Sequence, residues 1–170
     1  MGMSSIFLRV SLEDLQKFVG KGDLFLEYIA SIYSYEDDEI GEVLLDLDKS
    51  WDGLIYLLTG SSLHNAPKDS FASLFFSGQL IDPEQDVGYG PAHYLTPDQV
   101  KRYWQKLEQL NKDVLRSRYD ASMMNDAEVY PNYWTDDNEE IDYLMTIFEE
   151  LLAFMQVAVE EEAAIITYLS

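Results

Sequence analysis

The fold class is indicated by NEEIDYLMTIFEELLAFMQVAVEEEAAIITYL at residues 138–169, in which a long helical pattern passes directly into a strand pattern. Apolar residues recur at helical spacing from Ile141 to Met155, which predicts a helix over about 138–160 with one buried face. The segment AAIITYL at 163–169 predicts a final strand. A strand that follows a long helix indicates a sheet covered by helices.

The rest of the chain extends this pattern. The amino-terminal segment SIFLRV predicts a second strand over 5–10, so both ends of the chain are strand-like. Asp48 is placed to cap a helix that Gly60 ends, and Thr96 with Gln99 forms a capping box. Helices are predicted over about 11–19, 24–33, 48–60, 71–76 and 97–110, a loop over 36–39 and a strand over 92–95. We therefore predict a single α+β domain over residues 1–170, with a small mixed sheet covered by several helices.

The composition describes a strongly acidic protein. Eleven Lys and Arg stand against 32 Asp and Glu, so the net charge is 11 − 32 = −21. This charge repels phosphate backbones and anionic lipid, so direct nucleic-acid binding is not expected. The sequence contains no Cys, no secretory signal pattern and no apolar run of about 18 residues. We predict a cytoplasmic protein without membrane contact, and the sequence gives no indication of its oligomeric state.

The negative charge is concentrated near the carboxyl end. Residues 136–170 contain no Lys or Arg. Such a surface has two interpretations, a solvated face that keeps the protein dispersed or a landing surface for a basic partner protein. The residues assigned to the candidate partner surface are Asp136, Asp137, Glu139, Glu140, Glu149, Glu160 and Glu161.

The stretch GYGPAHYLTPDQV at residues 88–100 resembles a phosphate-binding loop only superficially. A dinucleotide fingerprint needs a third glycine, and a P-loop needs a Gly-Lys-Ser/Thr sequence. Neither is present, and Pro91 removes an amide that a phosphate cradle would use. Gly88 and Gly90 are therefore predicted to turn the chain before a strand.

Other catalytic and metal patterns are incomplete. VLLDLDKS at 43–50 resembles a phosphatase signature, but no acidic metal motif follows it, and Trp51 replaces the glycine that a calcium loop requires. His64 and His93 lie far apart without a zinc-binding spacing. We predict no metal site and no cofactor, and we favour a non-enzymatic protein.

The segment LRSRYDASMMNDAEVYPNYW at 115–134 places Arg118 near several aromatic residues. If Arg116 or Arg118 is buried it needs a carboxylate partner, which Glu128 or Asp48 could supply in a structural ion pair. Alternatively, Arg118 could hold an anionic ligand in an aromatic pocket.

Five ordered segments resemble the YfbM-like family of bacterial proteins of unknown function. They are MGM at 1–3, LDLDKSWDGLIYLLTG at 45–60, GYGPAHYLTPDQV at 88–100, LRSRYD at 115–120 and MNDAEVYPNYW at 124–134. The resemblance implies a cytoplasmic bacterial protein with an α+β fold, and implies no activity. Within these segments, the candidate ligand pocket comprises Asp48, Trp51, Tyr94, Arg118, Tyr119, Tyr130 and Trp134.

Two functional hypotheses follow. The first is an acidic protein-binding module, resembling an inhibitor or immunity protein, that engages a basic partner. The second is a small-molecule binder or enzyme in which Arg118 holds an anionic ligand within the aromatic pocket.

Overall fold

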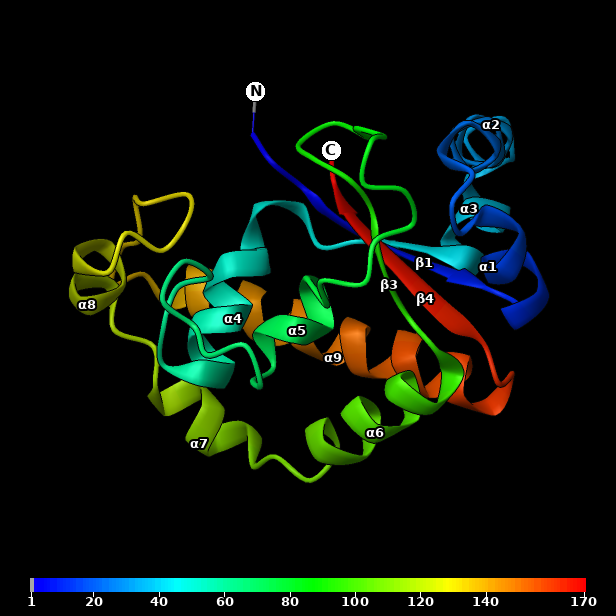
Figure 1. Cartoon of the computed structure of the whole chain (residues 1–170). Helices are drawn as coiled ribbons and strands as arrows, with labels where there is room; N and C mark the ends of the chain where they lie inside the picture. Colours follow the sequence, from blue (N-terminus) through cyan, green and yellow to red (C-terminus); the bar gives the residue numbers. More distant parts are fainter. Residues whose placement is uncertain (1) are drawn as a thin grey trace.

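The computed structural model describes residues 2–170, apart from the side chains of residues 37 and 38, and within that range a four-stranded sheet forms the centre (Figure 1). The strands lie in the order β2-β1-β4-β3. Their bounds are β1 Ser5–Val10, β2 Leu44–Asp46, β3 His93–Leu95 and β4 Ala164–Leu169. The first and last strands are thus the two central strands of the sheet, and Ser4 and Ser170 exchange two backbone hydrogen bonds of 3.0 Å beyond them.

Helices occupy most of the sequence between β1 and β4. Their bounds are α1 Leu12–Phe18, α2 Gly22–Ile32, α3 Asp37–Val43, α4 Trp51–Thr59, α5 Ala72–Phe75, α6 Pro97–Leu107, α7 Lys112–Ser117, α8 Ala121–Asp126 and α9 Asn138–Glu160. This combination confirms the predicted α+β fold.

The two faces of the sheet bury separate layers of apolar side chains, because successive residues of a strand point in opposite directions. Ile6 and Leu8 of β1 pack with residues of α1, α2 and α3. Phe7 points the other way, into a larger layer that includes residues of α4, α5, α6 and α9. Figure 1 shows α1 to α3 on one side of the sheet and the larger helical group on the other.

Local sequence signals account for several boundaries. Thr96 and Gln99 form the predicted capping box at the start of α6, and Ser11 accepts a hydrogen bond from the Asp14 amide at the start of α1. Gly60 has a φ of 79° where α4 ends. The long helix α9 and the strand β4 lie where the pattern of 138–169 predicts them.

Three predictions are corrected by the structure. The strand pairs are all antiparallel, so the sheet is not mixed. Residues 36–39 are not a loop: α3 begins at Asp37 and packs Ile40 and Val43 against the sheet. Asp48 caps no helix, since it has a φ of 48° and starts a short 3₁₀ turn, Asp48–Ser50, that joins β2 to α4.

The glycines of GYGPAHYLTPDQV turn the chain, as predicted. The φ values of Gly88 and Gly90 are 145° and 104°, a region that disfavours other residues. The carboxylate of Asp86 accepts hydrogen bonds from both amides, at 2.8 and 3.0 Å, so these donors are not free to hold a phosphate. A Cβ atom on Gly88 would lie 2.8 Å from the Leu169 carbonyl oxygen, which shows how closely this turn packs on the end of β4.

His93 of β3 links the sheet to the preceding loop. Its Nδ1 accepts a hydrogen bond from the Gly78 amide at 3.0 Å, and burial lowers the pKa of the imidazole from 6.5. The unfolded chain therefore binds a proton at His93 more readily than the folded protein does. The stabilising effect of neutral His93 is present above pH 6.5 and is lost as the pH falls below it.

We expect His93→Asn to reveal this dependence, because the Asn oxygen can accept from Gly78 but does not titrate. The free energy of unfolding of the native protein, measured in urea from pH 7.5 to 5, should fall relative to that of the variant as the pH decreases. A constant difference between the two proteins across this range would show that the folded state does not disfavour protonation of His93.

Candidate functional site

A pocket of about 240 Å³ lies where the beginning of α9 meets two loops. One loop contains residues 48–50, between β2 and α4, and the other contains residues 131–134, before α9. The pocket is lined by Asp48, Lys49, Ser50, Pro131, Tyr133, Trp134, Glu140 and Tyr143. We call it the acidic aromatic pocket. Its two tyrosines are among the most exposed aromatic residues of the described chain, Tyr133 at 62% and Tyr143 at 46%.

Asp52 of α4 holds the loop that forms one wall. Its side chain is 2% exposed, and its two carboxylate oxygens accept hydrogen bonds from the Leu63 amide at 2.7 Å and the Tyr130 amide at 2.8 Å. Burial raises the pKa of Asp52, and the two amide donors partly oppose that effect. One buried carboxylate therefore joins α4 to two loops that are distant in sequence.

Trp134 is fixed on three sides. Its indole N–H donates to the Val129 carbonyl at 2.9 Å, and its backbone exchanges two hydrogen bonds with the side chain of Asn125. The ring lies against Gly53 of α4, where a Cβ atom would be 2.6 Å from the ring atom Cη2. The absence of a side chain at residue 53 lets the indole pack directly on the helix backbone.

Trp51 and Tyr130 form the buried support beneath this region. Their rings stack with centroids 5.4 Å apart, and Trp51 is only 4% exposed. The Trp51 indole N–H donates to the Met3 carbonyl at 3.0 Å, and the Met3 amide donates to the Tyr130 hydroxyl at 2.7 Å. These two aromatic residues anchor the amino-terminal segment rather than line the pocket.

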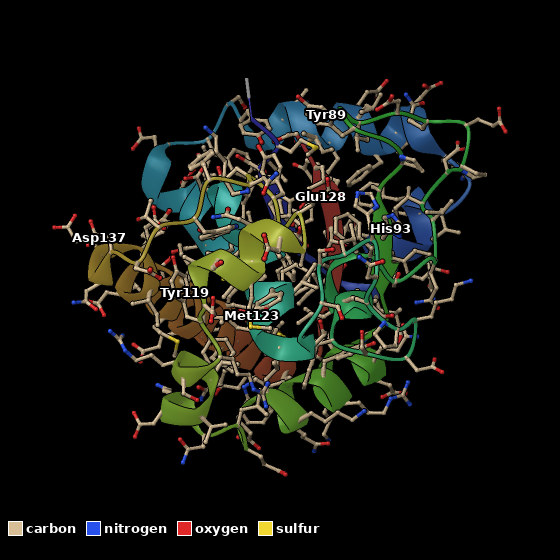
Figure 2. The ribbon with its side chains drawn as sticks, turned by 90° about the vertical axis from the view of Figure 1, so that its left-hand side faces the viewer. Tyr89, His93, Tyr119, Met123, Glu128 and Asp137 are labelled. Atoms are coloured by element: carbon tan, nitrogen blue, oxygen red, sulfur yellow. The ribbon has the colours of Figure 1, made fainter. Side chains whose placement is uncertain are left out.

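Glu140 is positioned by Tyr119 and Thr135. Its Oε2 accepts from the Tyr119 hydroxyl at 2.9 Å and from the Thr135 amide at 2.8 Å, while the Tyr119 hydroxyl also approaches the Thr135 carbonyl at 2.6 Å. Burial, with a smaller effect from Glu140, raises the pKa of Tyr119, so this phenol stays protonated. Figure 2 shows Tyr119 and Asp137 on the side of the molecule where α9 begins.

The charges around the acidic aromatic pocket favour the binding of a cation. Asp48 and Glu140 contribute two negative charges and Lys49 one positive charge, a side-chain sum of −2 + 1 = −1. The hydroxyl of Tyr143 lies 3.5 Å from Oδ2 of Asp48, and burial, followed by the charge of Asp48, raises its pKa. The faces of aromatic rings attract positive charge, as the carboxylates do.

Arg118 does not line this pocket, and its predicted ion pair is wrong. Its side chain is exposed at the end of α7, and within residues 2–170 it pairs with neither Glu128 nor Asp48. Its Nη1 instead donates to the Leu57 carbonyl at 2.8 Å. The last carbonyls of a helix lack intrahelical partners, so the end of α4 supplies the acceptor.

Tyr94 also lies apart from the other predicted pocket residues. It belongs to β3 and packs in the layer with α1 to α3, whereas Trp51 and Trp134 pack in the layer on the opposite face of the sheet. His93, beside it on β3, lies across the view of Figure 2 from Asp137. Of the seven predicted residues, the structure therefore places Asp48 and Trp134 in the acidic aromatic pocket, with Trp51, Tyr119 and Tyr130 behind its walls.

The residues of the predicted partner surface are spread along α9, because this helix has 23 residues and spans about 35 Å. At its beginning, Asp137 accepts a hydrogen bond from the Glu139 amide as the helix cap, and Asp136, Glu139 and Glu140 lie within three residues of it in sequence. Further along, Glu149 pairs with Lys112 at 2.9 Å. At the far end Glu161 pairs with Arg9 at 2.8 Å, next to Glu160.

No group of three or more His, Asp and Glu side chains is placed to hold a metal ion in the part of the chain that the structure describes. Within residues 2–170, none of the helices combines the length and apolar character that a membrane-crossing segment needs.

Comparison with known proteins identifies the family. The family model described as "Domain of unknown function (DUF1877)" matches residues 1–168. The chain belongs to this family. No curated protein matches the chain.

A solved structure supports the fold of this DUF1877 chain. The crystal structure of a protein of unknown function, YfbM from Escherichia coli, superposes with a TM-score of 0.68 and 21% sequence identity, covering 98% of this chain and 99% of the other. At this identity the match demonstrates a shared fold. Together the two matches confirm the YfbM-like resemblance, although Met1 of the MGM segment lies outside the described residues.

Four residues that build the site of this DUF1877 member were not among those predicted from the sequence. Tyr133 and Tyr143 line the pocket, and Asp52 and Gly53 hold its walls. A signal was available for two of them, because Asp52 and Gly53 interrupt the apolar face of an otherwise buried helix in LDLDKSWDGLIYLLTG. A buried carboxylate needs hydrogen-bond donors, and a helical glycine often marks close packing.

Proposed function

We propose that this protein is a non-enzymatic binding module that receives a basic side chain of a partner protein in the acidic aromatic pocket. The observation that carries the proposal is the position of Asp48 and Glu140 around exposed aromatic rings. A guanidinium or ammonium group can stack on such rings while it donates to carboxylates. The side-chain sum of −1 matches a single Lys or Arg.

Charge around the pocket supports the same partner. Asp136, Asp137 and Glu139 lie next to Glu140, and the whole chain carries a net charge of −21. Such a field speeds association with a basic surface and excludes acidic partners. The protein would act in the manner of an inhibitor or immunity protein. A cytoplasmic setting in a bacterium, which the family resemblance implies, is part of the proposal.

The alternative, an anionic small molecule held by Arg118, receives less support. Arg118 lies at the end of α7 and donates to a helix carbonyl, while the pocket that contains Trp134 carries carboxylates. An anion in that pocket would meet like charge.

The test is a titration followed by NMR, with the peptide acetyl-Gly-Arg-Gly-amide as the probe and its citrulline analogue as the neutral control. We expect the Arg peptide to shift the Trp134 indole resonance and the citrulline peptide to leave it unchanged. Asp48→Asn and Glu140→Gln should each weaken binding about tenfold, the loss of one charge-assisted hydrogen bond. Binding should also weaken as salt is added.

Glu160→Gln is the matched control, because it removes the same charge from the far end of α9. We expect its affinity to stay within about twofold of the native value, since charges separated by more than the Debye length of about 8 Å are screened. Equal losses in Glu160→Gln and Glu140→Gln would indicate diffuse attraction and contradict a defined pocket. Equal shifts with arginine and citrulline would contradict recognition of charge.

A further inference from the structure

A second hollow, of about 550 Å³, lies between residues 68–73 and the helix α6. Its volume falls in the range of about 300–1,000 Å³ that is usual for small-molecule sites. None of the residues that line it lines the acidic aromatic pocket. We call it the basic groove, because Lys68, Arg102 and Lys106 line it in a protein that has only 11 Lys and Arg.

One face of α6 forms a wall of the basic groove. Counted from Gln99, the lining residues Arg102, Tyr103 and Lys106 follow three, four and seven positions later. This spacing places them on the same side of the helix. The position of this face is fixed at the start of α6. Gln99 accepts from the Thr96 amide at 2.9 Å and from the Gln79 side chain at 2.8 Å. Gln79 also donates to the Tyr94 carbonyl at 3.0 Å, which ties the floor of the groove to β3.

The opposite wall is a tight turn. The hydroxyls of Ser70 and Ser73 donate to the carbonyls of Pro67 and Lys68, so their protons stabilise the turn and are not available to an anion. Phe71 lies in this turn, and its ring centroid is 6.4 Å from that of Tyr103. The groove therefore has an apolar aromatic surface beside its cations.

The three cations of the basic groove are available to bind an anion. Arg9, Lys17, Lys112 and Arg116 form ion pairs with carboxylates, whereas none of the groove's three cations pairs with a carboxylate whose side chain the structure describes. All three residues are exposed. Their lack of a carboxylate partner among the described side chains is notable because the protein contains 32 Asp and Glu. Asp69 is the carboxylate among the lining residues, so the groove has a side-chain sum of 3 − 1 = +2.

We infer that the basic groove binds a small organic phosphate monoester. Such a group carries a charge of about −1.5 to −2 at neutral pH, which matches the sum of +2. Arg102, as a planar fork, can donate to two phosphate oxygens, and Lys68 and Lys106 can neutralise the rest. Phe71 and Tyr103 then contact the organic part of the ligand. The remote carboxylates of the protein are screened at physiological ionic strength, where the Debye length is about 8 Å.

The test compares inorganic phosphate and phenyl phosphate as probes in NMR titrations of the full chain. Phenyl phosphate is expected to shift the amides of residues 68–73 and of α6, and to bind more tightly than inorganic phosphate. Arg102→Gln and Lys106→Gln should each weaken binding about tenfold. Lys101→Gln, which removes the same charge from a residue of α6 that does not line the groove, should change the affinity less than about twofold.

Three results would overturn the inference. They are the absence of shifts in the basic groove at millimolar probe, equal affinity for the two probes, and equal losses in all three variants. The substituted residues are exposed, and thermal unfolding will show that each variant folds. The result is independent of the proposed function, because the two sites prefer ligands of opposite charge.

Discussion

Asp52→Ala is expected to lower the free energy of unfolding by about 2–4 kcal/mol, because it removes the buried acceptor of two amide hydrogen bonds. Those amides belong to Leu63 and Tyr130, which approach the carboxylate at 2.7 and 2.8 Å. The loss should be measured by urea denaturation. Hydrogen exchange should show that these two amides lose protection more than others do.

Two further variants sharpen this prediction. Asp52→Asn should have an intermediate effect, since its oxygen can accept from one amide while its NH₂ group faces the other. Asp126→Ala, at an exposed position of α8, is the matched control and should change stability by less than about 0.5 kcal/mol. If Asp52→Ala is as stable as the control, the two loops are held by other contacts and Asp52 does not organise the pocket wall.

Gly53→Ala is expected to destabilise the protein by about 1–3 kcal/mol, the usual effect of overfilling a packed interior. In an exposed helix the same change would stabilise by up to about 1 kcal/mol. At residue 53 the change in stability has the opposite sign, because the new Cβ atom would lie 2.6 Å from Cη2 of Trp134 and 3.2 Å from Cδ2 of Leu144. Displacement of Trp134 should also weaken binding of the Arg peptide in the acidic aromatic pocket.

The control for this prediction is Gly41→Ala in α3, where a Cβ atom meets nothing within 4 Å. It should leave stability unchanged or raise it. Combining Gly53→Ala with Trp134→Leu should recover part of the loss, because the shorter side chain leaves room for the methyl group. If Gly53→Ala stabilises the protein as Gly41→Ala does, the indole is not seated on Gly53.

Much of the fold could be predicted because it depends on local patterns. The capping box of Thr96 and Gln99, the glycine after α4 and the apolar stripe of α9 each act over a few residues. The wrong prediction of a loop at residues 36–39 also comes from reliance on local patterns. The acidic run there has no helical pattern of its own, and α3 forms because Ile40 and Val43 pack against the sheet.

The candidate site could be predicted only in part. The predicted pocket residues share only the segments that resemble the YfbM-like family, and in the structure Arg118 turns to the end of α4 and Tyr94 to the other face of the sheet. No sequence pattern marked Tyr143 as a pocket residue, since it lies on the polar side of a helix. It meets Asp48 only because α9 passes the loop after β2, 95 residues away in sequence.

Local sequence patterns were sufficient to predict the α+β class, the positions of most helices, the acidic charge and the turn at Gly88 and Gly90. These properties follow from composition and from interactions between residues close in the chain. Packing between distant parts of the chain, in contrast, brings Asp52 to two loops, turns the cations of α6 toward a groove and spreads the acidic residues of the predicted partner surface along the whole of α9. Contacts between distant residues depend on the packing of the whole chain, and no local pattern specifies them.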